Sequence, residues 1–147
     1  MECPFCHPKP ENVVYEDKFI RILLDNYPAN PGHLLVVPKR HVTSIGNLTE
    51  DEKLALLKGI ELAVKALKRA LKADGFNVGI NIGKAAGQTV DHIHIHVIPR
   101  YEGDCDYPEG GIRKAVLNFP DENLRNTKNR LSSKEIERIR RVLNGSE

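Results

Sequence analysis

The chain has 147 residues, yet it contains no tryptophan, one methionine and only three cysteines. A sparse and odd-numbered set of cysteines argues against the disulfide framework of a small secreted domain. No uninterrupted apolar run approaches the ~20 residues of a membrane-spanning helix. The first residues, MECPFCHPKPE, include neither the basic nor the apolar part of a signal peptide. We therefore expect a cytoplasmic protein that does not contact a membrane.

A surplus of one charge is also absent. The 22 basic and 20 acidic residues are interspersed and give a formal net charge of +2. Because a nucleic-acid-binding domain presents a concentrated basic surface, no nucleic-acid partner is expected. The stretch from Arg125 to Arg141 is locally basic, and we interpret it as the solvated face of a helix. With 40% apolar residues, the composition is that of a globular domain that buries its own core.

One long helix is predicted in the middle of the chain. Thr49 and Glu52 form a capping-box pair, and Gly75 offers a stop signal. Between them, apolar residues recur at three- and four-residue spacing, which predicts a helix over 49–73. The recurring residues are Leu54, Leu57, Ile60, Val64, Leu67 and Leu71.

Shorter elements flank this helix. A second capping-box pair, Ser132 with Glu135, opens a C-terminal helix that closes at Asn144 and Gly145. Apolar segments of strand length, bounded by turn residues, predict strands at 13–15, 19–24, 34–37, 76–82 and 93–98. Several closely spaced strands with one long helix imply an α+β domain.

Five of the six histidines carry the functional argument, and three of them form the run His92-Ile93-His94-Ile95-His96. Side chains alternate between the two faces of a strand, so the three imidazoles share one face. The isoleucines between them share the other face and anchor the strand in a core. The imidazoles are thereby held rigidly where chemistry can use them.

Three interpretations of this run compete. The first is a set of structural, hydrogen-bonded histidines. The second is one metal site, but same-face neighbours stand roughly 6.7 Å apart and the outer pair ~13 Å apart, while a zinc–nitrogen bond is only ~2.0–2.1 Å. The third is an anion-binding and nucleophilic face, which the preceding Gly87-Gln88-Thr89 favours with backbone access and neutral donors. We adopt the third.

The run from Gly87 to Arg100, GQTVDHIHIHVIPR, resembles the signature of the histidine-triad (HIT) family. The stretch from Pro31 to His41, PGHLLVVPKRH, with Asp25 before it, resembles that family's second block. The resemblance covers residues 3–106 and implies a HIT fold, with about five antiparallel strands and one long helix. It implies a HIT domain over 1–106, with 107–147 as a C-terminal extension packed on it. It also implies a homodimer paired around the long helix and a sheet edge.

The resemblance assigns the chemistry to His94. The middle histidine of the triad is the family's nucleophile, and a neutral imidazole suits that role near pH 7. It would attack the α-phosphorus of a nucleotide and form a nucleotidyl-histidine, which water or phosphate then cleaves. Its other ring nitrogen needs an acceptor, for which we expect a backbone carbonyl. The catalytic pair implied is His94 and His96.

The resemblance also implies a nucleotide-binding set. Asp25 would accept hydrogen bonds from the ribose hydroxyls, although an Asp before Asn26 and Pro28 could instead simply start a turn. Donors around the phosphate would stabilise the charge that builds there; these are His33, His96, Asn81, Gln88 and Thr89. The base pocket is expected to contain Phe5, Leu23 and Asn26.

A cysteine pair, Cys3-Pro4-Phe5-Cys6, opens the chain. Alone it is ambiguous, because half a zinc site, a redox pair and coincidence all fit. Some bacterial histidine-triad proteins and related nucleotidylyltransferases complete such a pair with two histidines, here His41 and His92. By this resemblance one structural Zn²⁺ per chain is expected, and no organic cofactor. His7 is interpreted as a surface residue, and Cys105 is given no function.

The residues after Pro99 bear on the branch of the family. Arg100-Tyr101-Glu102-Gly103-Asp104 is similar to the Pro-Arg-x-x-Gly-Asp stretch of dinucleoside polyphosphate hydrolases and phosphorylases. Cleavage of such nucleotides is therefore the expected activity. The alternatives are an adenosine phosphoramidase of the same family and a nucleotide-binding regulatory module with little turnover. An organiser whose zinc is the functional element is also left open.

Overall fold

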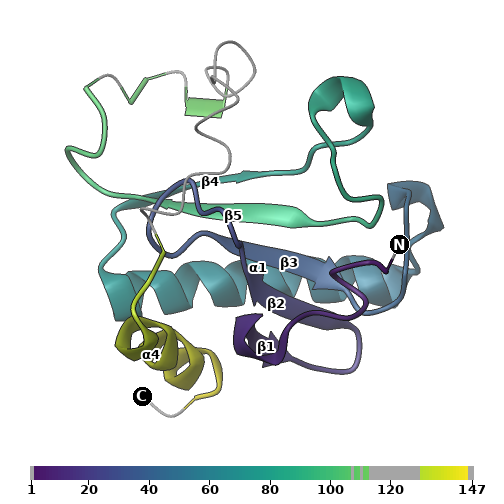
Figure 1. Ribbon diagram of the computed structural model, residues 1–147, viewed down its shortest axis with the longest axis horizontal. Coiled ribbons are helices and arrows are strands. Elements are labelled where there is room, and N and C mark those ends of the chain that lie inside the picture. The colour runs from purple at the N-terminus through teal and green to yellow at the C-terminus, as the bar shows by residue number, and fades with distance from the viewer. Residues whose placement is uncertain (1, 107, 110, 113–129, 146–147) are drawn as a thin grey trace.

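The computed structural model describes residues 2–106, 108–109, 111–112 and 130–145. Within them, a five-stranded antiparallel sheet has the order β1-β2-β3-β5-β4, and a long helix lies against one of its faces (Figure 1). The strands are β1 (Val13–Glu16), β2 (Ile20–Leu24), β3 (Leu34–Pro38), β4 (Gly75–Gly79) and β5 (Ile95–Arg100). The helices are α1 (Glu50–Leu71) and α4 (Ser133–Leu143), with 3₁₀ turns at Pro10–Asn12, Ile45–Asn47 and Lys84–Ala86. The predicted α+β class and HIT fold are confirmed.

The two faces of the sheet have different neighbours. Ile22 pairs with Val36, and Val36 with Ile95; this row belongs to the main core, which α1 covers. One residue further along, Leu23 pairs with Leu35, and Leu35 with His96. Because successive side chains alternate between faces, this second row lies on the face opposite α1. The helix therefore leaves one face of the sheet for a site.

The start of α1 is as predicted, but its end and its buried face are not. Thr49 caps the helix in a capping box with Glu52. At the other end, Lys72 rather than Gly75 takes the left-handed conformation, with φ 59°. Leu54 and Leu57, assigned to the buried stripe, are 53% and 65% exposed.

Small residues form the buried side of α1 instead. Gly59, Ala63, Ala66 and Ala70 are buried together with the larger Leu56 and Leu67. A Cβ at Gly59 would lie 2.6 Å from Cδ1 of Ile20 and 2.8 Å from Cγ1 of Val36. The helix thus approaches the sheet too closely for a row of leucines, and the apolar pattern alone could not reveal this distance.

Strands β4 and β5 are shorter at one end than the apolar segments predicted. The ladder between β3 and β5 stops at Val36 and Ile95, short of Pro38, which has no N–H to donate. His92 to His94 therefore precede the regular strand, and the amide of Ile93 bonds to the carbonyl of Val42 (2.8 Å). Since Gly79 pairs with His96, β4 runs out of partner soon after.

The C-terminal helix packs on the same core, with Ile139 and Leu143 buried. The sequence suggested that this helix presents a solvated basic face, but two of its arginines bond to neighbouring elements. Arg138 donates to the carbonyl of Ala70 (3.1 Å), and Arg140 donates to that of Val13 (3.2 Å). The extension predicted over 107–147, and the basic stretch within it, lie partly outside the described residues.

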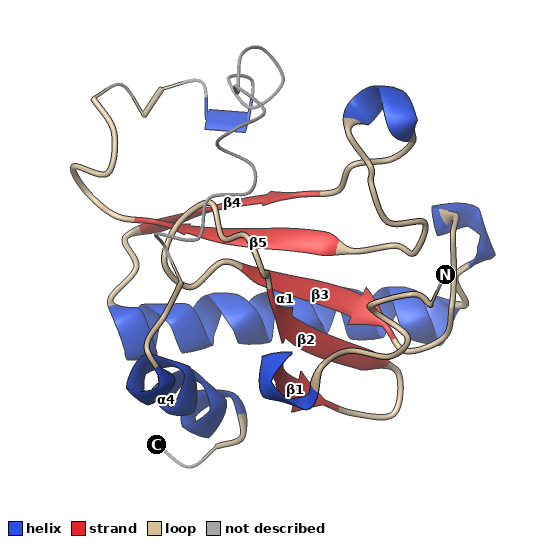
Figure 2. Cartoon of the chain, viewed as in Figure 1, coloured by secondary structure: helices blue, strands red, loops and turns tan. Residues whose placement is uncertain are grey.

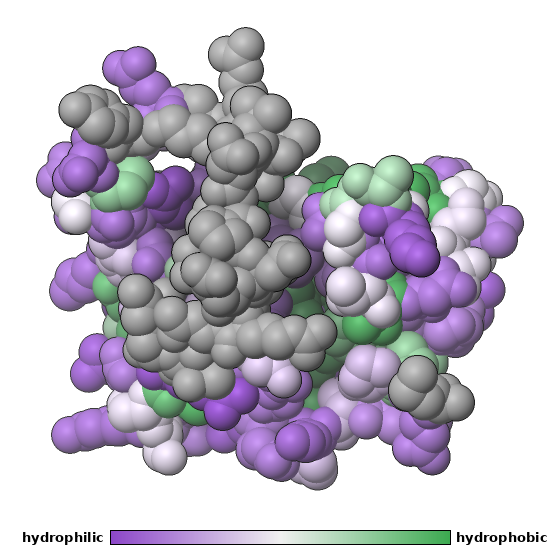
Figure 3. Space-filling view, turned by 45° about the horizontal axis from the view of Figure 1, so that its top comes forward, coloured by the Kyte–Doolittle hydropathy of each residue, from purple (hydrophilic) through white to green (hydrophobic). Residues whose placement is uncertain are grey.

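Among the described helices, none combines the length and apolar character needed to cross a bilayer. The face seen in Figure 3 is mostly hydrophilic, with apolar residues in small patches. Figure 2 shows that the loop between β4 and β5 carries a short helical turn and stands away from the sheet.

The close contact of Gly59 with the sheet leads to a prediction about stability. Gly59→Ala places a methyl group against Ile20 and Val36 and should lower the free energy of unfolding by about 1–3 kcal/mol, measured by urea denaturation. Gly46→Ala is the matched control, because its Cβ would meet nothing closer than 3.7 Å; it should change stability by less than about 0.5 kcal/mol. Equal effects of the two substitutions would contradict the close packing.

Candidate active site and metal centre

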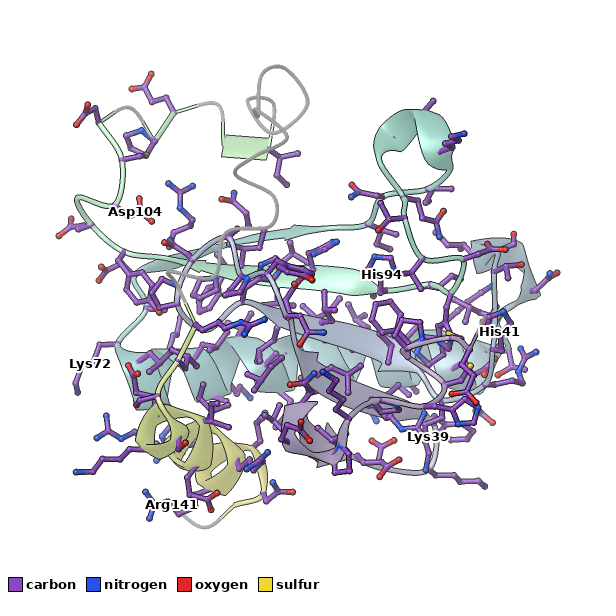
Figure 4. The ribbon with its side chains drawn as sticks, in the orientation of Figure 1. Lys39, His41, Lys72, His94, Asp104 and Arg141 are labelled. Carbon is purple, nitrogen blue, oxygen red and sulfur yellow. The ribbon has the colours of Figure 1, made fainter. Side chains whose placement is uncertain are left out.

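His94 and the four residues expected to bind zinc gather at one end of the sheet. Asp25 and His33 lie at the other end of the β2–β3 pair, where Leu24 pairs with Leu34. Figure 4 shows His94 and His41 at this end, with sulfur atoms beside His41, while Asp104 and Lys72 lie at the opposite end. The N-terminal cysteine turn reaches this end because Phe5 packs against Leu23, Leu35 and Val37 on the open face. Three segments that are distant in sequence therefore meet at the triad.

His92 is oriented by both ring nitrogens and is fully buried. Its Nε2 lies 2.8 Å from the carbonyl oxygen of Pro38, to which it donates a hydrogen bond. That bond leaves Nδ1 as a lone-pair donor, 3.2 Å from Sγ of Cys3 and 3.4 Å from Sγ of Cys6. Fixing one nitrogen on a carbonyl so that the other faces a metal is the usual arrangement of a ligating histidine.

His41 completes a four-residue cluster, since its Nδ1 lies 3.2 Å from Sγ of Cys6. The ligand atoms of Cys3, Cys6, His41 and His92 all lie within 4.8 Å of one another. Around a tetrahedral ion with bonds of about 2.0–2.3 Å, ligand atoms stand about 3.3–3.8 Å apart. The cluster fits a closed Cys2His2 zinc site of the structural kind.

Charged side chains brace the two segments that carry this cluster. Beside His41, Arg40 forks onto Glu52 at 2.8 and 3.1 Å, and Glu52 also accepts the amide of Thr49 (2.9 Å). The Arg40 guanidinium lowers the pKa of Glu52 by its hydrogen bond. Arg21 donates to the carbonyl of Phe5 (3.3 Å) within the cysteine turn.

His94 has one committed nitrogen and one free nitrogen. Its Nδ1 donates to the backbone carbonyl of His92 (2.8 Å), which is the kind of acceptor expected from the sequence. Its Nε2 has no hydrogen-bond partner in the described part of the chain. The rings of Phe5 and His96 lie against the His94 ring, with centroids at 4.9 and 5.1 Å. With Nδ1 as the donor, the lone pair of the neutral form of this ring lies on Nε2, away from the backbone carbonyl.

His33 and His96 form a second fixed pair. The amide of Ala29 donates to Nδ1 of His33 (2.9 Å), so the proton of His33 is on Nε2, which lies 2.9 Å from Nδ1 of His96. His96 then carries its own proton on Nε2, where it is available as a donor. Burial is the largest cause that lowers the pKa of both rings, with that of His96 at about 4.

This proton order changes the expected role of His33. Both of its nitrogens are occupied, and it is only 5% exposed, so it orients His96 rather than reaching a phosphate itself. The order also argues against a metal held by Asp25, His33 and His96, although their ligand atoms are close. A metal would need the Nε2 of His33, which already carries the proton.

Asp25 takes the turn-starting role considered for it, and its second oxygen faces the site. Its Oδ1 accepts the amide of Tyr27 (2.8 Å), which starts the turn. Its Oδ2 lies 3.5 Å from Nε2 of His33 and faces the histidine pair. One oxygen of the carboxylate therefore holds the turn, and the other faces the histidine pair.

Of the phosphate donors expected on the loop before the triad, Gln88 is bonded within the loop itself. The Gln88 amide accepts from the backbone of Gly83 (2.8 Å) and donates to the carbonyl of Val90 (2.9 Å). Asn81 and Thr89 are exposed. The side chain of Gln88 therefore bonds within its own loop, and the spacing of Gly87-Gln88-Thr89 could not reveal this.

Two of the three residues expected in the base pocket, Phe5 and Leu23, lie together. Phe5 and Leu23 pack together with three residues that the sequence analysis missed, namely Val13, Leu35 and Val37. The alternation after His33 could have placed Leu35 and Val37 on this face. Asn26 is not part of this apolar cluster, but it lines a cavity of about 220 Å³ together with Asp25 and His33.

The stretch after β5 has a local structural role. Arg100 forks onto Asp104 with two bonds of 2.8 Å, and it also donates to Asn77 and to the thiol of Cys105. The guanidinium holds the pKa of Asp104 well below its usual range. Because this ion pair lies at the other end of the sheet from His94 (Figure 4), it contributes no group to the triad.

Comparisons with known proteins agree with this arrangement. An uncharacterized HIT-like protein of Methanocaldococcus jannaschii is 43% identical over 118 residues, which are 78% of this chain and 91% of the relative. The AP-4-A phosphorylase of Mycobacterium tuberculosis is 41% identical over 96 residues, 65% of this chain but 49% of the phosphorylase, so the chain spans about half of that enzyme. A crystal structure of a zinc-bound histidine triad family protein from Mycobacterium smegmatis matches with a TM-score of 0.72 and 31% identity, covering 99% of this chain and 95% of that one. The HIT domain model matches residues 7–103, and the chain belongs to the HIT domain family.

Proposed function

We propose that this protein is a nucleotide hydrolase or transferase that acts on the α-phosphate of dinucleoside polyphosphates or related nucleotides. The free Nε2 of His94, fixed by the bond from Nδ1 to the His92 carbonyl, is the observation that carries the proposal. The AP-4-A phosphorylase relative supports this substrate class, although the chain covers only half of that enzyme.

The proposed reaction has two steps at His94. Nε2 attacks the α-phosphorus, the bond from phosphorus to the bridging oxygen breaks, and the leaving phosphate departs with the electron pair. The Nδ1 proton stays on the ring and shares its charge with the His92 carbonyl. Water or inorganic phosphate then attacks the nucleotidyl-histidine and restores the neutral imidazole.

Neighbouring residues would bind and orient the nucleotide. His96 would donate its Nε2 proton to a non-bridging oxygen, with His33 as the residue that positions it. The Oδ2 of Asp25 would accept a ribose hydroxyl. The base would lie against Phe5 and Leu23. Gln88, Thr89 and Asn81 would complete the phosphate site after the loop opens.

We propose that Cys3, Cys6, His41 and His92 hold one structural Zn²⁺. The thiolate and imidazole donors suit this ion, and four protein ligands leave no position for substrate. The ion would tie the N-terminal turn to the sheet and would take no part in the chemistry. Residues 107–147 are proposed as an extension packed on the domain formed by 1–106.

A homodimer is the proposed assembly, in the cytoplasm as expected from the sequence. The exposed apolar side chains of Ile45, Leu57 and Ile80 line one shallow hollow of about 300 Å³, whose floor includes Ile60 and the buried Ile95. Exposed apolar patches of this kind mark interaction surfaces.

His94→Ala should lower turnover of diadenosine tetraphosphate by on the order of 10³-fold or more, because the nucleophile is lost. AMP binding, measured by calorimetry, should persist. His7→Ala is the matched control, since His7 is exposed, and it should retain activity. If the His94→Ala variant still cleaved diadenosine tetraphosphate at the wild-type rate, the covalent mechanism would be rejected.

Products identify the branch of the family. The wild-type enzyme should cleave diadenosine tetraphosphate, and adding inorganic phosphate shows whether phosphate replaces water as acceptor. A phosphoramidate cleaved in preference would favour the phosphoramidase alternative. If the protein bound these nucleotides but cleaved none of them, the result would support the alternative of a nucleotide-binding regulatory module.

The buried histidine pair generates a pH prediction. Since the pKa of His96 is lowered from 6.5 to about 4, its ring should stay neutral down to about pH 4, as followed by NMR. The unfolded chain binds this proton near pH 6.5, so the free energy of unfolding should fall as pH falls from about 6.5 to 4. Asp25→Asn removes a carboxylate that raises the pKa and should shift the titration lower. Titration near pH 6.5 in the wild type would contradict the assignment.

The dimer surface can be tested at one exposed residue. Leu57→Asp places a charge on the apolar hollow and should give a monomer by analytical ultracentrifugation, with unchanged circular dichroism. Lys58→Asp, at the next exposed position, should leave the dimer intact. A wild-type chain that is monomeric at micromolar concentration would reject the assembly.

A further inference from the structure

The cysteine turn contributes a ring to the active site as well as ligands to the metal centre. Phe5 lies between Cys3 and Cys6 in the sequence. Its ring packs on His94 with centroids 4.9 Å apart and meets His92 edge-on at 5.8 Å. The same ring is the aromatic member of the apolar cluster beside the triad. One short turn therefore places a wall of the nucleotide pocket directly on the nucleophile.

Few contacts hold this turn in place. Its side chains are tethered by the cysteine contacts to His41 and His92, at 3.2 to 3.4 Å, and by the packing of Phe5 on Leu23, Leu35 and Val37. Its backbone is held by the bond from Arg21 to the Phe5 carbonyl (3.3 Å) and by one bond within the turn, from His7 to Cys3 (3.1 Å). Residues this close to a terminus fray unless they are tied down. The position of Phe5 thus depends on what joins the cysteines to the histidines as well as on its own apolar packing.

His92 also connects the metal centre with His94, through its carbonyl, but it does not depend on the metal in the same way. It is fully buried, and its Nε2 is bonded to Pro38 independently of the cysteines. Loss of the metal would leave His92 in place and would free the turn. Of the two connections, the one through Phe5 is therefore the one that can change.

We propose that zinc at Cys3, Cys6, His41 and His92 sets the nucleotide affinity of the active site by holding the ring of Phe5 against the base and His94. The inference rests on the proposed function, because it assumes that a nucleotide base lies beside Phe5. Phe5 is here a positioning residue for the nucleotide, and the metal acts through it.

A thermodynamic cycle on AMP binding tests this coupling without relying on turnover. AMP affinity is measured by calorimetry for the full chain, zinc-loaded and zinc-stripped, in the wild type, Phe5→Leu and Phe19→Leu. Stripping should weaken binding about 5- to 100-fold in the wild type, the range for losing one aromatic contact to a base. In Phe5→Leu, stripping should change the affinity less than about twofold, because the ring through which the metal acts is already gone. Phe19 is half-buried against the other core, so Phe19→Leu should behave like the wild type.

Several outcomes would overturn the proposal. Equal AMP affinity with and without zinc would show that the metal has no influence on the pocket. An equal loss in Phe5→Leu and the wild type would show that the influence does not pass through Phe5. A stripped chain without its circular dichroism signal would show that zinc holds the whole fold. AMP that binds to no form would instead reject the nucleotide site itself, and so distinguishes failure of the proposed function.

A fluorescent reporter offers a second measurement. Since the chain has no tryptophan, Phe5→Trp gives a single emitter in the turn. Stripping zinc should shift its emission to longer wavelength as the ring leaves the apolar cluster, and adding zinc should reverse the shift. Emission that does not respond to zinc would overturn the proposal.

Discussion

The hydrogen bond from Nδ1 of His94 to the backbone carbonyl of His92 is the contact on which the rest of the site depends. It decides which ring nitrogen keeps the proton and therefore which nitrogen is a nucleophile. Because the acceptor is a main-chain atom two residues away, its position follows the path of the chain just before β5. That path is set in turn by Pro38, which lies beyond the end of the strand ladder and accepts a bond from His92.

The same device recurs around the triad, and it gives each imidazole a different task. A carbonyl fixes His92 toward the cysteines, another fixes His94 toward open space, and the amide of Ala29 fixes His33 and, through it, His96. In the proposed function, three similar side chains on one run of sequence are thereby divided among a metal centre, a nucleophile and a proton donor. Backbone groups, which side-chain substitution does not remove, make this division.

Much of this could be predicted from the sequence. The alternation of histidines and isoleucines fixed which residues enter the core, and the capping boxes located both helix starts. The free nitrogen of His94 and the Cys2His2 cluster also followed from motifs. What failed depends on distances between elements: Leu54 and Leu57 face outward while small residues pack where α1 lies close to the sheet at Gly59, and Gln88 bonds within its own loop. Neither spacing nor composition contains that information.

The amide of Gln88 is hydrogen-bonded within its own loop, so it would have to break these bonds before it could contact a ligand. Both ends of the amide are already satisfied, by Gly83 and Val90. A ligand that recruits this side chain must offer two hydrogen bonds in exchange for the two it breaks. If the proposed phosphate site uses Gln88, molecules poor in donors and acceptors would leave the loop closed. The loop would then select by hydrogen-bonding capacity, and the apolar cluster beside His94 would select by shape.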